Sequence, residues 1–284
     1  MTFDYWFLFP VSVLIATIAM ASGVGGAVFF TPLFILGLQL DPAVAVGAAL
    51  IAELFGFTSG LYAYSKRRLI DYRLGFSLLL FSVPAAILGS LCSGAFPPGI
   101  LKGIFAAGLM FLGSQIYLSW RQDGLAGPDG PSVSHDPKAT THELTARDGT
   151  VYHYTIRHKN QGRGLAFVGG VFLGMISVGL AELQEYQLVA RCRVPAPVAV
   201  ATSIFVVVVS VLVASAGHMV GFVSTADEVL MRKVLSVVIF SVPGVVVGGQ
   251  IGPFVQARIP PQVSKVGLAI LFVLVGLFML TTLL

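Results

Sequence analysis

The chain has 284 residues, of which 56% are hydrophobic and only 11% are charged, with a formal net charge of +4. Its mean hydropathy is +0.89. Because a soluble domain carries about a quarter charged residues, this composition excludes an ordinary soluble protein and indicates a polytopic membrane protein. The positive residues flank apolar runs, as orientation signals do, and give no indication of nucleic-acid binding.

The first apolar run, 7–38, is too long for one upright span of about 20 residues and is interrupted. Three glycines at 23, 25 and 26 and then Pro32 break the helical pattern, so we expect two arms, about 7–22 and 27–38. Such a break survives in lipid only where protein lines a cavity, and interrupted segments mark substrate sites in transporters. The alternative is a glycine seam for close helix packing.

The next predicted spans are 43–64, 74–92 and 100–119, and a polar segment follows at 121–163. Alternation from Leu144 to Ile156 around Asp148-Gly149 predicts a small β-hairpin with a two-residue turn. The four histidines of this segment match no zinc pattern, so we expect no metal and no cofactor. The later predicted spans are 164–190, again interrupted, 196–222, 233–252 and 264–283.

An internal repeat is visible in the sequence. Phe81-Ser82-Val83-Pro84 with Gly89 recurs as Phe240-Ser241-Val242-Pro243 with Gly248. Extending that register backwards places the first glycine break over Ser177-Val178-Gly179. We therefore expect a first membrane repeat over 1–120, a soluble loop over 121–163 and a second membrane repeat over 164–284.

Charge counting favours inverted repeats, each with a re-entrant broken hairpin and three transmembrane helices. In that arrangement eight positive residues share one side: Lys66, Arg67, Arg68, Arg73, Arg191, Arg193, Arg258 and Lys265. Lys102, Arg232 and Lys233 share the other. The alternative, in which each broken segment crosses once, divides the charges almost evenly, so the positive-inside rule favours re-entrant hairpins with an outer N-terminus.

Two half-helices, beginning near Gly26 and Gly179, would then point their N-termini at one central site. Free N–H groups and helix dipoles at such ends favour an anion. The predicted substrate-binding residues are Ser22, Gly23, Gly25, Gly26, Ser177, Gly179, Thr202 and Ser203.

Three glutamates lie within the apolar runs, and intramembrane acids are candidates for a functional site. Glu53 is halfway along its span, Glu182 lies just after the second break at a similar depth, and Glu185 follows one turn later. We assign proton coupling to these three, with a structural hydrogen bond as the alternative for Glu53 and Glu182. Glu185 is equally consistent with a polar arm end at the interface. His218, near the end of its span, is expected at the interface.

The repeat and the glycine motif together resemble the TauE/SafE sulfite-exporter family of bacterial membrane proteins. The resemblance rests on Gly23-Val24-Gly25-Gly26, Pro32-Leu33 and Ala45-Val46-Gly47-Ala48, and in the second half on Val178-Gly179 and Ala199 to Ser203. It departs from the family pattern at 180–185, where two glutamates replace an expected glycine run.

The resemblance implies export of sulfite or a small organosulfonate across the bacterial inner membrane. The glutamates add a proton-coupling hypothesis. Another small carboxylate or a neutral metabolite is the alternative cargo, and a sensor or assembly protein acting through 121–163 is a further alternative. We expect no enzymatic activity, since the spans hold neither paired aspartates nor a serine with a placed base. The expected partners are a small anion, protons and the lipid bilayer, with a homodimer left open and no nucleic acid.

Overall fold

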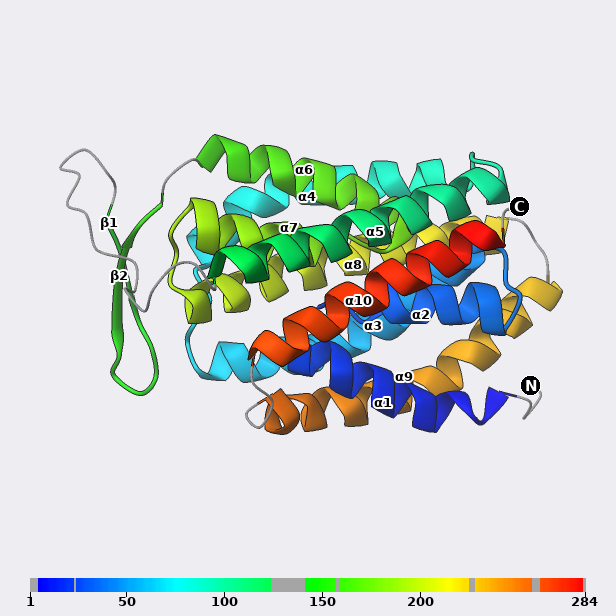
Figure 1. Cartoon of the computed structure of the whole chain (residues 1–284), viewed down its shortest axis with the longest axis horizontal. Helices are drawn as coiled ribbons and strands as arrows, with labels where there is room; N and C mark the ends of the chain where they lie inside the picture. The colour runs from blue at the N-terminus through cyan, green and yellow to red at the C-terminus, as the bar shows by residue number, and fades with distance from the viewer. Residues whose placement is uncertain are drawn as a thin grey trace.

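The computed structural model describes residues 5–22, 24–123, 141–156, 159–224, 228–256 and 261–282. Helices lie along the long axis of the molecule, and a two-stranded sheet stands at one end (Figure 1). Five helices are long and apolar enough to cross a bilayer: α3 (Pro42–Lys66), α4 (Tyr72–Ser93), α5 (Pro98–Asp123), α8 (Ala196–Ser224) and α9 (Glu228–Gln256). The prediction of a helical, multi-pass membrane protein is confirmed.

The remaining helices include the broken segments that the glycines predicted. Shorter apolar helices are α1 (Leu8–Ser22), α2 (Ala27–Pro32) with the π-helical turn η2 (Leu33–Gly37), and α10 (Pro261–Thr281). The second broken segment consists of α6 (Lys159–Ile176), α7 (Leu180–Tyr186) and the π-helical turn η3 (Gln187–Arg191).

The local sequence explains where the segments change direction. Pro32 has no backbone N–H to donate, and α2 widens into η2 directly after it. At the second break, Ser177 and Gly179 have left-handed backbone angles, with φ of 59° and 109°. Glycine adopts such an angle without steric cost, whereas a serine there is uncommon.

Helices of the first half of the chain pack against helices of the second half. α1 lies against α9 and α6 lies against α4, while α3 packs on α8 and α5 on α10. Glycines make the first two pairings close. A Cβ added at Gly248 would meet the backbone of Val13, and one added at Gly174 would meet the backbone of Ala86. Each broken segment is therefore anchored to a helix of the opposite half.

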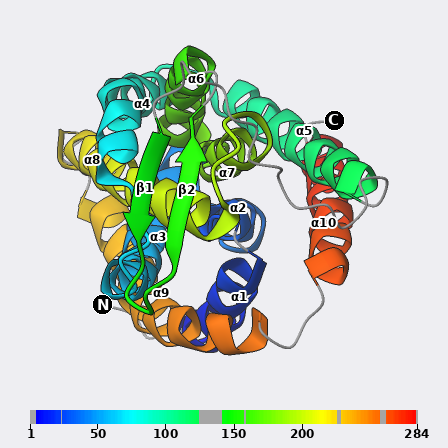
Figure 2. The ribbon, with the colours of Figure 1, turned by 90° about the vertical axis from the view of Figure 1, so that its left-hand side faces the viewer.

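The predicted β-hairpin is confirmed, with strands β1 (Thr141–Thr145) and β2 (Val151–Thr155) in antiparallel register. Figure 2 shows the strands crossing the ends of the helices. The predicted two-residue turn is wrong. Ala146 N–H donates to the Thr150 carbonyl, which encloses three residues and leaves Gly149 in a left-handed conformation. The Asp148 carboxylate accepts the Thr150 N–H at 3.0 Å, and this local bond favours the wider turn.

Candidate functional site

The two broken segments meet inside the bundle. Gly25 N–H donates to Glu182 Oε1 at 3.3 Å, and Thr31 Oγ1 lies 2.6 Å from Ser177 Oγ. Both hydroxyls are buried. These bonds join residues 157 and 146 positions apart in the chain, so the structure brings together the two tips that the sequence aligned.

One carboxylate holds both tips. Glu182 is the third residue of α7, and its Oε2 accepts the N–H of Gly179 at 3.2 Å, which caps the start of its own helix. Its other oxygen reaches Gly25 in the first broken segment. Glu182 therefore occupies donors from both helix starts at once.

A second carboxyl group closes the site from α3. Glu53 Oε1 accepts the Ala27 N–H at 3.3 Å, and the Glu53 side chain is only 3% exposed. A Cβ added at Gly25 would lie 2.6 Å from Glu53 Oε1 and 3.7 Å from Glu182 Oε1. The two carboxyl groups thus flank Gly25, as their predicted similar depth requires.

The charge balance of this site is unusual for a membrane interior. Neither glutamate forms an ion pair with a described residue, and Glu53 Oε2 has no hydrogen-bond partner among the described residues. Two ionised carboxyl groups at this distance repel each other. Among the described contacts, only backbone N–H groups place partial positive charge against them. Backbone N–H groups at helix starts are donors that other oxyanions also accept.

The other predicted residues fall into three groups. Gly26 lies at the start of α2 with an ordinary helical backbone, beside this site. Thr202 and Ser203 lie elsewhere: the Thr202 hydroxyl accepts the N–H of Asp71, and the Ser203 hydroxyl donates to Val200 in its own helix. Gly23 and the side chains of Ser22 and Glu185 lie outside the described residues.

Thr202 belongs to a second buried acidic cluster beneath the β-hairpin. Asp71 accepts the Leu74 N–H at 3.0 Å and the Tyr154 hydroxyl at 2.8 Å, and lies 3.3 Å from His142 Nδ1. Burial, with the bond to Asp71 adding to it, raises the pKa of Tyr154 above its ordinary value. Tyr154 therefore stays a protonated donor that ties the hairpin to the start of α4, and Thr202 ties that start to α8.

Sequence reasoning missed three features near the breaks. The Thr31 hydroxyl joins the two tips, and its only sequence signal was a polar residue before Pro32. Gln184 is fully buried, and its amide has no hydrogen-bond partner among the described residues. His218, expected at the interface, is 4% exposed, and its Nε2 lies 2.8 Å from the Gly174 carbonyl. Close packing of α8 on α6 and α3 encloses this histidine.

Comparison with known proteins gives a consistent result. The sequence model of a family described as "Sulfite exporter TauE/SafE" matches residues 8–279. A probable membrane transporter protein of Bacillus subtilis, YunE, is 23% identical over 276 residues, covering 95% of this chain and 94% of the relative. A second, YjnA, is 24% identical over 243 residues, covering 84% and 86%. No solved structure matches the chain.

Proposed function

The chain belongs to the sulfite exporter TauE/SafE family of membrane transporters, and we propose that it moves a small sulfur-containing anion outward across the bacterial inner membrane. The proposed cargo is sulfite or an organosulfonate. The observation that carries the proposal is the meeting of two helix breaks at a shared carboxylate, Glu182. Interrupted helices whose starts face one point are the common form of a transporter's substrate site.

The proposed mechanism is an exchange of anions on the same backbone donors. Glu182 and Glu53 hold the N–H groups of Gly179, Gly25 and Ala27 while the cargo is absent. An arriving oxyanion takes these donors when a carboxyl group is protonated, because a neutral carboxyl accepts hydrogen bonds more weakly than a carboxylate. Binding of the anion and of a proton are thereby coupled.

The hydroxyls beside the donors complete the proposed site. Ser177 and Thr31 lie at the junction of the two breaks, and Gly26 precedes the donor at Ala27. Thr202 and Ser203 remain predicted for binding, although their hydroxyls are engaged near the hairpin end. The roles of Ser22, Gly23 and Glu185 rest on the sequence alone.

Helix pairing supports two related repeats, and the course of the first segment supports their inverted, re-entrant form. Gly244 lies beside Phe9 and Gly248 beside Val13, so α9 runs parallel to α1; Gly170 beside Ser82 and Gly174 beside Ala86 give the same relation for α6 and α4. If a twofold axis relates the two halves, the packing of α1 on α9 must be repeated by the packing of α6 on α4, as it is here. Moreover, the start of α1 lies at the end of the helices opposite the hairpin in Figure 1, whereas a first segment crossing once would bring the two to one side.

A small carboxylate is the second candidate cargo. The observation that favours it is Glu182 itself, whose carboxylate bridges donors from both breaks.

Efflux from proteoliposomes tests the proposal. Vesicles are loaded in turn with sulfite, methanesulfonate, thiosulfate or acetate, and release is compared with that from protein-free vesicles, with and without a pH gradient. We expect sulfite or the sulfonate to leave fastest and the rate to depend on the gradient. Faster release of acetate would assign the site to carboxylates, and equal rates with and without the gradient would remove the coupling.

A further inference from the structure

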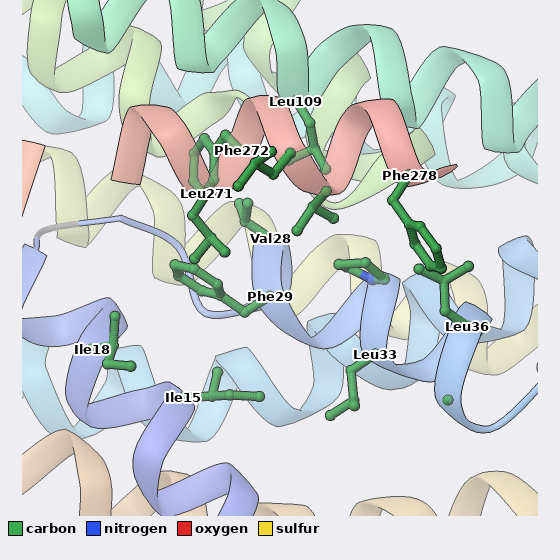
Figure 3. Close-up of a pocket in the computed structure, with 14 residues that line it drawn as sticks. Ile15, Ile18, Val28, Phe29, Leu33, Leu36, Leu109, Leu271, Phe272 and Phe278 are labelled. Carbon is green, nitrogen blue, oxygen red and sulfur yellow. The ribbon is translucent and has the colours of Figure 1, made fainter. Parts of the chain in front are cut away.

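A cavity of about 580 Å³ lies between the first broken segment and α10 (Figure 3), and neither Glu53 nor Glu182 lines it. Residues of α1, α2, η2, α5 and α10 line it, and none has a polar side chain. The lining consists of Ile15, Ile18, Val28, Phe29, Pro32, Leu33, Leu36, Gly37, Leu109, Leu271, Phe272, Leu274, Val275 and Phe278.

The short arm α2–η2 separates this cavity from the carboxylate site. Phe29, Leu33 and Leu36 line the cavity at helical spacing, so they share one face of the arm. Thr31 lies between Phe29 and Leu33 in the sequence. Its side chain is fully buried and forms the hydrogen bond to Ser177. Whatever fills the cavity therefore supports the arm that carries the Ala27 donor.

The cavity faces the bilayer rather than the centre of the bundle. Four of its lining side chains are more than one-third exposed: Ile18 at 42%, Leu271 at 38%, Leu274 at 58% and Phe278 at 57%. Figure 2 shows α1 and α10 at the periphery of the helices. In a membrane transporter the solvent at these apolar helices is lipid hydrocarbon, since water finds no hydrogen-bond partner in such a lining.

We propose that this cavity binds an acyl chain of a membrane lipid. Its volume falls within the range of about 300–1,000 Å³ typical of ligand pockets, and its purely apolar lining matches a hydrocarbon chain. A helix from a second copy, about 10 Å across, would fit little more than one turn into this volume. With no polar side chain in the lining, the site selects the chain and not the headgroup.

Photolabelling in proteoliposomes tests the site without a flux measurement, so its outcome is independent of the proposed transport. The probe is a phosphatidylcholine with a diazirine on one acyl chain, and the labelled residues are located by peptide mass spectrometry. We expect Ile18, Leu274 and Phe278 to be labelled at least fivefold more than Leu80 and Leu212, which are 72% and 53% exposed. Labelling in proportion to exposure would overturn the proposal.

A filling substitution gives the matched test. Leu274→Trp occupies part of the cavity and lowers labelling of Ile18 at least fivefold, whereas Leu212→Trp, on the outer face of α8, leaves it unchanged. Leu36→Trp repeats the test from the opposite wall should Leu274→Trp fail to fold. Unchanged labelling of Ile18 in a folded variant contradicts the proposal. Cross-links between two protein copies through Leu274→Cys, in place of lipid labelling, would assign the cavity to an interface between copies.

Discussion

Among the described residues, two sites place carboxyl groups at helix starts, and the sites differ in how fully the carboxyl oxygens are hydrogen-bonded. Asp71 caps α4 through the Leu74 N–H and also receives the Tyr154 hydroxyl and His142. Glu182 caps α7 from the third position inside the helix, where it accepts the Gly179 N–H, but its second oxygen bonds the opposite half of the chain, and neighbouring Glu53 retains an oxygen without a described partner. The capping chemistry is shared, and the surroundings differ.

Under the proposed mechanism, this difference separates a structural anchor at Asp71 from a functional junction at Glu182 and Glu53. At Asp71 each carboxylate oxygen has a donor, so rearrangement there loses bonds without gaining new ones. At Glu182 and Glu53 the partners are backbone N–H groups that another oxyanion can accept equally well. Changes at the junction should therefore affect transport, and changes at the anchor should affect stability.

The largest effect is expected at the junction. Glu182→Gln keeps one oxygen as an acceptor but replaces the other by an NH₂ group, which cannot accept a hydrogen bond from the backbone N–H that it faces. One hydrogen bond to a charged group is therefore lost, and such bonds contribute about 1.5–3 kcal/mol. Initial sulfite efflux, normalised to reconstituted protein, should fall at least about tenfold, since about 1.4 kcal/mol is a factor of ten. Glu143→Gln, on the exposed face of β1, is the control. Efflux at the normal rate would remove Glu182 from the mechanism.

At the anchor, Asp71→Asn should act on stability instead. An amide keeps one oxygen to cap α4 but loses the second acceptor that Tyr154 and His142 use, at a cost of about 1–3 kcal/mol. The thermal unfolding midpoint in detergent should fall, while efflux per folded molecule stays within about twofold of the original, a change of about 0.4 kcal/mol. Asp148→Asn, in the exposed turn, serves as the comparison. A tenfold loss of efflux with the unfolding midpoint unchanged would contradict the assignment of Asp71 to stability rather than transport.

A smaller effect is expected where the two breaks touch through hydroxyls. Thr31→Val keeps the shape and removes the bond to Ser177, whose hydroxyl still donates to the Ile176 carbonyl. A loss of about 1 kcal/mol corresponds to roughly a fivefold slower efflux. Thr58→Val, which removes only a bond within α3, should leave the efflux rate unchanged. Equal rates in the two variants would show that the Thr31 bond is only structural.

The smallest effect belongs to the hairpin. Tyr154→Phe removes one donor from Asp71 and should loosen the strands by about 1 kcal/mol, seen as faster amide hydrogen exchange over 141–156. The pKa of Tyr154 is raised above its ordinary value of 10.0. The stability that its hydroxyl contributes is therefore fully present below pH 10.0 and is lost only as the pH rises from there through the raised pKa. Tyr152→Phe is the control. Protection that is unchanged in Tyr154→Phe would show that the hairpin is held by its backbone alone.

Local patterns were sufficient to predict most of the architecture. Length and apolarity predicted the long helices, and glycines with Pro32 predicted the first break, because these residues act on the backbone where they stand. The hairpin followed from alternation around Gly149, although its turn depended on the Asp148 bond to Thr150. The nearness of Glu53 to Glu182 followed from their depth.

Contacts between distant parts of the chain were beyond sequence reasoning. Thr202 is predicted to bind substrate, and no signal in the sequence indicated that its hydroxyl accepts the Asp71 N–H 131 residues away. His142 had no evident partner until the hairpin was placed over α4. The hairpin also bonds its own transporter, through Arg147 N–H and the Arg67 carbonyl, which favours an internal role over a docking module. Such pairings depend on tertiary packing and leave no periodic signal.

The most direct test of the junction compares two adjacent glycines. In Gly25→Ala the new Cβ would lie 2.6 Å from Glu53 Oε1, whereas in Gly26→Ala it would lie 3.7 Å from the Phe30 ring, an ordinary contact, and both variants keep the backbone N–H. Initial sulfite efflux from proteoliposomes should be lost in Gly25→Ala, by at least about tenfold, or about 1.4 kcal/mol, and be nearly normal in Gly26→Ala. Equal efflux from the two variants would contradict the placement of the transport site between Glu53 and Glu182.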